Sequence, residues 1–223
     1  MIFKRKIYEE LLHWKRTDEG RTAVLIQGAR RVGKSTIAEE FAAKEYETYI
    51  LVDFAACSTE IRDLFNDVSD LNRIFMRLQF EYGVELKERK SVIIFDEVQL
   101  APKARQAIKY LVKDGRYDYI ETGSLISIRK NVKDILIPSE ETKLYMYPMD
   151  YEEFRWALGD TATVKLLQGC FLNRTSLGDA TNRKLMRDFR LYMLVGGMPQ
   201  AVASYLETNN LEKVDSVKRS VIT

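Results

Sequence analysis

The chain has 223 residues, 46% hydrophobic and 30% charged, which is enough to bury the core of one full domain and a smaller appendage. Its formal net charge of +2 excludes a strong overall attraction to nucleic acid or to a membrane surface. Cys57 and Cys170 stand far apart without a Cys/His cluster, and no apolar run approaches the ~20 residues of a membrane span, so we expect a soluble cytoplasmic protein without a structural zinc site or a disulfide scaffold.

The first part of the chain predicts a helix, a strand, a loop and a second helix. Apolar residues at helical spacing predict the first helix over residues 4–16. The apolar run 23–26 predicts a strand, and a helical pattern follows to about residue 46. Between the strand and the second helix, the sequence GARRVGKS fits the pattern G-x-x-x-x-G-K-S, which is typical of a phosphate-binding loop in this context.

The residue types of this loop suit the binding of phosphate groups. Gly28 and Gly33 permit close approaches that a side chain would block, so backbone N–H groups can point at phosphate oxygens. Lys34 brings a positive charge to the outer phosphates, and the Ser35 hydroxyl is a candidate ligand of Mg²⁺. A glycine turn that binds nothing is the alternative interpretation. The candidate nucleotide-binding residues of the loop are Gly28, Ala29, Arg30, Arg31, Val32, Gly33, Lys34, Ser35 and Thr36.

The middle of the chain predicts strands that alternate with helices. This alternation indicates a parallel sheet with helices on both faces, and ligands of such sheets bind at the carboxyl ends of the strands. A polar stretch over residues 129–141 predicts a mobile loop. The expected strands cover residues 48–54, 91–95, 117–122 and 142–147, and the expected helices cover 59–82, divided near 67–70, and 101–113.

Acidic and hydroxyl residues follow two of the predicted strands. Asp96 ends the apolar run 91–95, where it can hold the hydration shell of Mg²⁺ beside Ser35. Glu97, one residue later, can orient and polarise a water against the terminal phosphate. Thr122 and Ser124 end the next strand, and a hydroxyl there can touch the terminal phosphate or the attacking water. A surface acidic pair and a plain turn with a capping serine are the alternatives.

The C-terminal part of the chain predicts helices. Asp150 and Glu153 form a D-x-x-E start signal that resembles a capping box, and Gly159 fits the end of that helix. The sequence after it is helical in pattern and is broken by residues 196–199. We therefore expect a nucleotide-binding core over residues 1–155 and a helical part over 156–223, which the family resemblance described next identifies as a lid.

Several segments together resemble a prokaryotic family of AAA-type P-loop ATPases, in which the ATP-binding core is followed by a C-terminal domain of unknown function. The resemblance covers nearly the whole chain, and its motifs arrive in the family's order. They are residues 22–35, 92–99 (VIIFDEVQ), 121–127 (ETGSLIS), 145–154 (YMYPMDYEEF) and 195–202 (VGGMPQAV).

The resemblance implies an α/β fold of the AAA+/ASCE type with a sheet of order 5-1-4-3-2, flanked by helices and followed by a helical lid. It also implies that Glu97 is the catalytic glutamate and that Thr122 or Ser124 is the first sensor. Residues 197–199 are similar to the G-x-P element of signal-transduction ATPases of the STAND type, in which the proline, here Pro199, packs against adenine. A helix-breaking turn is the alternative. Family members continue beyond such a lid, so we expect the chain to be truncated before a further domain, and a short form of the family is the alternative.

We expect Mg²⁺-dependent ATP binding and hydrolysis that drives a regulatory or mechanical change. ATP is favoured because the sequence lacks the N-K-x-D and D-x-x-G signals of a GTPase. An ATP-binding switch with little turnover is the alternative. A small-molecule phosphotransferase is less favoured, because residues 125–142 lack the clustered arginines of an acceptor lid.

The expected partners are ATP or ADP, an unidentified protein and a second copy of the chain, but no membrane. Arg129 is the best-placed candidate for an intersubunit arginine finger, although a solvated loop arginine is the stronger interpretation. Arg183, Arg187 and Arg190 follow one helical face and could meet DNA phosphates, yet such a stripe is more often a solvated helix face, and the net charge gives no support. His13, the single histidine, receives no chemical role.

Overall fold

The computed structural model describes residues 1–124 and 140–222, and its contacts divide the chain into two compact units. One unit runs from Ile7 to Met146 and contains the sheet, and we call it the sheet unit. The other combines Met1–Lys6 with Tyr147–Thr223, and we call it the helical unit. The predicted functional boundary after residue 155 stays a prediction, whereas the contacts separate between residues 146 and 147.

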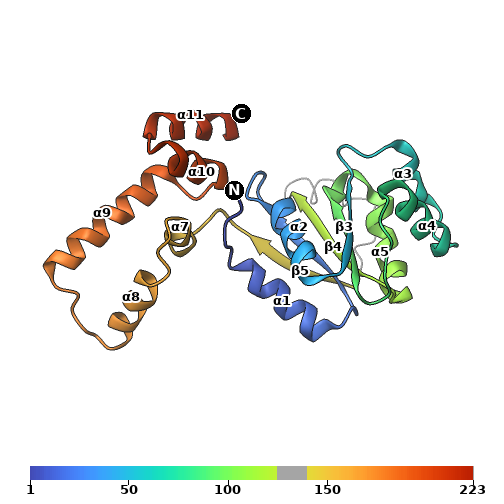
Figure 1. The fold of residues 1–223 in the computed structure, drawn as a ribbon, viewed down its shortest axis with the longest axis horizontal. Coiled ribbons are helices and arrows are strands. Elements are labelled where there is room, and N and C mark those ends of the chain that lie inside the picture. The colour runs from blue at the N-terminus through green and yellow to red at the C-terminus, as the bar shows by residue number, and fades with distance from the viewer. Residues whose placement is uncertain (125–139, 223) are drawn as a thin grey trace. The chain divides into compact units, whose positions relative to one another are not determined.

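The sheet has five strands in the order β2-β3-β4-β1-β5, all parallel (Figure 1). Read from the opposite edge, this is the predicted order 5-1-4-3-2, which is confirmed. Strand β3 is buried along its whole length, as its continuous apolar sequence predicts for a central parallel strand. The strands are β1 (Ala23–Gly28), β2 (Thr48–Asp53), β3 (Ser91–Asp96), β4 (Asp118–Ser124) and β5 (Glu141–Met146).

Helices cover both faces of this sheet (Figure 1). On one face, a core with Phe95 and Tyr119 at its centre packs under α3, α4 and α5. On the other, α2 packs on β1, β3 and β4, and α1 packs on β5. The helices are α1 (Ile7–Asp18), α2 (Lys34–Glu45), α3 (Thr59–Asp63), α4 (Leu71–Tyr82) and α5 (Pro102–Asp114), with short 3-10 turns η1 (Leu64–Asn66) and η2 (Val98–Leu100).

The helical unit has a small core of its own, in which Met149 and Phe154 pack with Val195 and Val202. The predicted capping box is confirmed, because Asp150 accepts from Glu153 N while the Glu153 carboxylate accepts from Asp150 N. The helices are α7 (Tyr151–Ala157), α8 (Thr163–Leu172), α9 (Asp179–Val195), α10 (Pro199–Thr208) and α11 (Leu211–Ile222).

The predicted break at residues 196–199 is confirmed, and two further breaks separate α8 from α9 and α10 from α11. At the first, Met149 N donates to Gly197 O at 2.7 Å, and a Cβ atom at Gly197 would lie 2.1 Å from Met149 O. Only glycine therefore fits this close approach. At the second, Arg174 and Gly178 have positive φ angles of 53° and 71°, which end and restart the helices.

The first helix begins at Ile7, so the predicted start at residue 4 is wrong. The reason is a contact within the helical unit, where Lys6 N donates to Glu153 Oε1 at 2.7 Å and Arg5 Nε lies 3.2 Å from the same oxygen. Both partners of the Arg5–Glu153 ion pair are buried. A helical pattern in the first residues is thus overridden by a partner that is distant in sequence.

The predicted loop over residues 129–141 lies largely outside the described residues. Its last residue, Glu141, is instead the first residue of β5, which ends at Met146 rather than at residue 147. Strand β4 also extends two residues further than predicted, to Ser124, and pairs with β1 over that length. These shifts move strand ends without changing the sheet.

Candidate nucleotide site

The loop between β1 and α2 is built around two glycines. Gly33 caps α2 with φ 96° and ψ 26°, a left-handed conformation that favours glycine. Gly28 ends β1 opposite Met146 of β5, and a Cβ atom at Gly28 would lie 2.1 Å from the Met146 carbonyl oxygen. The edge strand thus approaches β1 so closely that only glycine fits, and the loop leaves the sheet at that point.

Lys34 is the first residue of α2 and is buried, with 5% of its surface exposed. Its Nζ atom donates to the carbonyl oxygens of Ala29 at 2.8 Å and of Gly28 at 3.4 Å. Burial lowers the pKa of the Lys34 ammonium, and the nearby carboxylates of Glu97 and Asp96 oppose that shift. The ammonium is therefore held inside the loop, close to the free N–H groups at the N-terminus of α2.

The other predicted loop residues follow the same path. Val32 is buried in the core beneath the loop, whereas Arg30, Arg31 and Thr36 are exposed. Arg31 has a positive φ of 63°, which helps the loop to turn before Gly33. Arg30 and Arg31 therefore lie at the surface, whereas Val32 anchors the loop to the core.

One oxygen of Asp96 accepts hydrogen bonds from two hydroxyl groups on different elements. Ser35 Oγ donates to Asp96 Oδ1 at 2.7 Å, and Thr122 Oγ1 donates to the same oxygen. Asp96 ends β3 and Thr122 lies near the end of the neighbouring strand β4, so the sheet order brings them together. The structure thus joins three predicted site residues from α2, β3 and β4 in one hydrogen-bonded network.

Glu97 follows this network in an unusual backbone conformation. Its φ of 53° and ψ of 44° are left-handed, a region that costs a non-glycine residue roughly 1 kcal/mol or more. Its N–H donates to Thr122 Oγ1 at 3.3 Å, and its carbonyl oxygen accepts from Leu100 N at 2.9 Å. The conformation is therefore held from β4 on one side and by η2 on the other.

The side chain of Glu97 has a partner that the sequence did not indicate. The amide Nε2 of Gln99 donates to Glu97 Oε2, and Gln99 is buried, with 6% of its surface exposed. The only signal in the sequence is a polar residue between Val98 and Leu100, and that signal does not predict a contact with the preceding glutamate.

Three other predicted residues are not part of the hydrogen-bonded network of Ser35, Asp96 and Thr122 as the structure describes it: they are Ser124, Pro199 and Arg129. Ser124 is buried at the end of β4 and pairs with Gly28, so it flanks the phosphate-binding loop. Pro199 is the first residue of α10 in the helical unit. Arg129 falls outside the residues that the structure describes.

The donor set fits Mg²⁺ bound together with a nucleotide. Among the described residues there is no cluster of three or more Asp, Glu, His or Cys side chains for a metal ion. Mg²⁺ needs few protein ligands, because it usually keeps several waters and takes other oxygens from substrate phosphates. One serine hydroxyl and one aspartate oxygen, 2.7 Å apart, are consistent with such a site.

Comparisons with known proteins agree with the geometry. Residues 20–155 match a family described as an AAA domain. The structure is similar to the Walker-type ATPase PABY2304 of Pyrococcus abyssi, with a TM-score of 0.55 and 18% identity, over 99% of this chain and 72% of that one. It is also similar to C. elegans PCH-2, with a TM-score of 0.46 and 11% identity, over 95% of this chain and 64% of that one. No curated protein sequence matches the chain.

The likeness to the Pyrococcus abyssi ATPase structure supports the fold of the sheet and its helices. Within residues 1–124 and 140–222, no helix combines the length and the apolar character that a membrane crossing requires.

Proposed function

The chain belongs to the family of AAA-type P-loop ATPase domains, and on that premise we propose that it binds ATP with Mg²⁺ and hydrolyses it. The observation that carries the proposal is the convergence of Ser35 and Thr122 on Asp96 Oδ1, at the carboxyl ends of the strands and next to Lys34. Ligands of parallel α/β sheets bind at this edge.

The phosphate-binding loop supplies the contacts to the nucleotide. Its backbone N–H groups and the N-terminus of α2 offer donors and a positive dipole end to the phosphates. The Lys34 ammonium gives up its carbonyl partners, Gly28 and Ala29, for the outer phosphates, which carry full negative charge. The residues from Gly28 to Thr36 therefore form the proposed phosphate site.

Ser35 and Asp96 are the proposed Mg²⁺ residues. When bound, Mg²⁺ supplies neutralisation of the charge that develops on the phosphate oxygens. Asp96 has a second task in this arrangement, because it accepts from Thr122 as well as from Ser35. Through its hydrogen bond to Asp96, the Thr122 hydroxyl on β4 would respond to a ligand bound at that aspartate.

Glu97 is the proposed general base. Its carboxylate stands one residue beyond the Mg²⁺ aspartate, where it can accept a proton from a water aimed at the terminal phosphate. Thr122 fixes its backbone, and Ser124 lies beside the first glycine of the loop. Thr122 and Ser124 are therefore the proposed sensors of the terminal phosphate.

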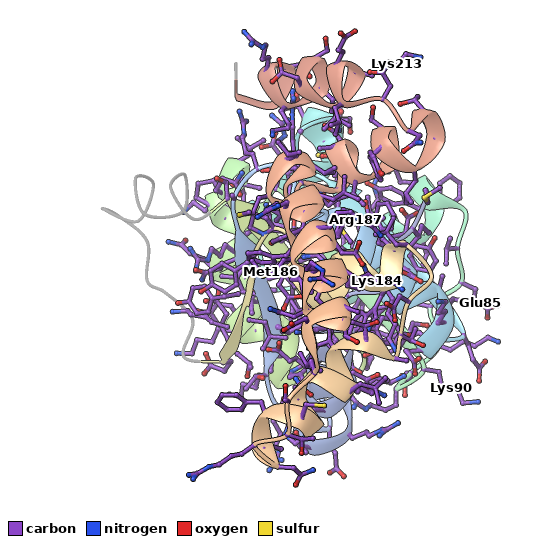
Figure 2. The ribbon with its side chains drawn as sticks, turned by 90° about the vertical axis from the view of Figure 1, so that its left-hand side faces the viewer. Glu85, Lys90, Lys184, Met186, Arg187 and Lys213 are labelled. Carbon is purple, nitrogen blue, oxygen red and sulfur yellow. The ribbon has the colours of Figure 1, made fainter. Side chains whose placement is uncertain are left out.

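The remaining proposals concern the output of the cycle. A regulatory or mechanical use of ATP is the proposed output, and the family resemblance is what supports the helical unit as a lid and Pro199 as its contact to adenine. A second copy of the chain or another protein is the proposed partner. Nucleic acid is a weaker one, although Arg183, Arg187 and Arg190 are exposed on α9, along which Figure 2 labels Lys184 and Arg187.

The deciding experiment measures steady-state ATP turnover with and without Mg²⁺ for the wild type and for Glu97→Gln, with ATP binding measured on both. We expect turnover in the wild type that requires Mg²⁺ and falls by about 100-fold or more in the variant, while binding survives. Tight binding with negligible turnover in both proteins would instead favour an ATP-binding switch. Glu47→Gln, at an exposed glutamate on the sheet unit, is the matched control.

A further inference from the structure

We infer that Gln99 is a positioning residue that fixes the carboxylate of Glu97 for the attack of water on ATP. The inference rests on the proposed function, because it assigns a partner to the proposed general base. Gln99 lies in η2, two residues after Glu97, and its amide group donates to Glu97 Oε2.

The direction of this hydrogen bond is set by the chemistry of the pair. An amide offers an acceptor oxygen and a donor NH₂ group, whereas an ionised carboxylate can only accept. Only the NH₂ group of Gln99 can therefore face Glu97, which fixes the orientation of the amide. A lysine at this position would cancel the negative charge of the carboxylate. A neutral amide donor holds the carboxylate and leaves its charge in place.

The two oxygens of Glu97 are used differently. Oε2 accepts from Gln99, whereas Oε1 accepts no hydrogen bond from any of the described residues. Lys34 does not compete for the carboxylate, since its Nζ donates to the carbonyl oxygens of Ala29 and Gly28. One oxygen is thus anchored, and the other is left to accept a proton from water.

Gln99 can act as an anchor because its own turn is fixed. Val98 is completely buried in the core under α5, and Ala101 is buried at the other end of η2. Ala101 N donates to Val98 O at 3.0 Å, which closes the turn. The amide is therefore presented from a rigid element, as a positioning residue requires.

Glu97 is consequently held at both ends. Thr122 holds its backbone N–H from β4, and Gln99 holds its side chain from η2. Without the contact to Gln99, the backbone of Glu97 would stay left-handed, but its side chain would gain freedom of rotation about the bonds next to the carboxylate. A displacement of about 1 Å in a reacting group can lower a rate by roughly 100-fold.

The test uses Gln99→Met, which keeps the length and flexibility of the side chain but removes the donor. We expect kcat to fall by about 10-fold or more while the Kd for ATP stays within about twofold of the wild type. Gln79→Met is the control, because Gln79 is another glutamine with a hydrogen-bonded amide, whose oxygen accepts from Leu86 N, but it lies on α4. This control should keep the wild-type kcat.

A double-mutant cycle separates positioning from a general structural effect. In a Glu97→Gln background, Gln99→Met should change the residual rate, measured in single turnovers followed for hours, by less than about twofold. An equal loss in both backgrounds would overturn the inference, because it would mean that Gln99 does not act through Glu97. An unchanged or raised kcat in Gln99→Met would overturn it as well.

A second variant covers the case in which Gln99→Met does not fold. Gln99→Asn keeps the amide but withdraws it by one methylene, and it should show the same loss of kcat at unchanged ATP affinity. If both variants retain full kcat, Gln99 has no positioning role. Failure of the proposed function is distinguishable, since the wild type itself would then show no turnover that depends on Glu97.

Discussion

Thr122 on β4 donates the hydrogen of its hydroxyl group to Oδ1 of Asp96 on the neighbouring strand β3. The same hydroxyl oxygen accepts from the backbone N–H of Glu97 at 3.3 Å. One short side chain thus connects the proposed Mg²⁺ aspartate with the proposed general base. Binding of a ligand at Asp96 is thus linked, through Thr122, to the backbone of Glu97.

Replacing Thr122 by valine should therefore reduce turnover while the fold is kept. Valine has the same shape but can neither donate to Asp96 nor accept from Glu97, and a hydrogen bond to a charged group contributes about 1.5–3 kcal/mol. We expect kcat to fall roughly 10- to 100-fold, which corresponds to that energy. Steady-state turnover would show it.

Two variants control for this effect. Thr122→Ser keeps the hydroxyl and should retain most of the activity. Thr142→Val removes a hydroxyl on β5 that lies 2.8 Å from the hydroxyl of Thr22, and it should leave kcat unchanged. If Thr122→Val turned over ATP at the wild-type rate, the link between Asp96 and Glu97 would carry no function.

Lys34→Ala should remove nucleotide binding. The variant deletes the buried ammonium that we assign to the outer phosphates, and loss of one partner of a desolvated charge pair costs about 2–5 kcal/mol. We expect the Kd for ATP to rise by about 100-fold or more. Lys44→Ala, at an exposed lysine of the same helix, is the control and should bind ATP as the wild type does. Isothermal titration would check both, and unchanged affinity in Lys34→Ala would exclude the site.

The strands and the phosphate-binding loop could be predicted because their signals are local. The run that ends at Asp96 is apolar throughout, and the G-x-x-x-x-G-K-S pattern fixes the loop within a few residues. The order of the strands came from a family resemblance rather than from the residues themselves. The family and the sheet order are confirmed, and the roles of the individual site residues stay predictions.

The missed features depend on contacts between distant or irregular segments. Helix α1 begins three residues late because Glu153 binds Lys6 N, and no local pattern carries that contact. The Gln99–Glu97 contact depends on a left-handed turn, whereas the notion of a strand end with two carboxylates assumes a regular backbone. Such features follow from tertiary packing, which periodicity does not report.

A buried carboxyl on β4 should make the stability of the sheet unit depend on pH. Glu121 is completely buried, and neither of its oxygens has a hydrogen-bond partner within the described residues. Burial raises its pKa well above the usual range, the neighbouring carboxylate of Glu141 adds to the shift, and Arg105 opposes it. Arg105 instead forms a buried ion pair with Glu141 at 3.0 Å. Glu121 is thus the carboxyl that stays neutral.

The sign of the effect follows from this raised pKa. Below about pH 4.5 both the folded and the unfolded chain carry a neutral Glu121, and its stabilising contribution is fully present. Between the unfolded-state pKa and the raised folded-state pKa, only the unfolded chain ionises, so the free energy of unfolding falls as the pH rises and levels off above the folded-state pKa. Glu121→Gln cannot ionise and should be more stable than the wild type at pH 9 by on the order of 1–2 kcal/mol.

Urea unfolding at pH 6 and pH 9 would measure this difference. The chain has two tryptophans, and Trp156 lies in the helical unit, so a Trp156→Phe background leaves Trp14 as a reporter of the sheet unit. Glu47→Gln is the control, since Lys87 and Lys90 lower the pKa of exposed Glu47 to about 2, outside the range tested. If Glu121→Gln showed the same dependence on pH as the wild type, Glu121 would not be its source.

Glu153→Ala should loosen the start of α7. This carboxylate completes the capping box and pairs with buried Arg5, and removing one partner of a buried ion pair costs about 3–5 kcal/mol. Glu152→Ala removes only the pair with half-exposed Lys6 and should cost about 1 kcal/mol or less. Hydrogen exchange in residues 1–6 and in α7 would check both, and equal protection in the two variants would contradict the expectation.

The pairing of residues 1–6 with Glu153 has a consequence for how the protein is made. In chain order the whole of Ile7–Met146 is inserted between two parts of the helical unit. Residues 1–6 are therefore synthesised before Ile7–Met146 and α7, and they lack their partners until both of these have been made. The sheet unit can complete its core during synthesis, whereas the burial of Arg5 against Glu153 is among the later steps. The order of translation thus favours a sheet unit that is formed before the helical unit.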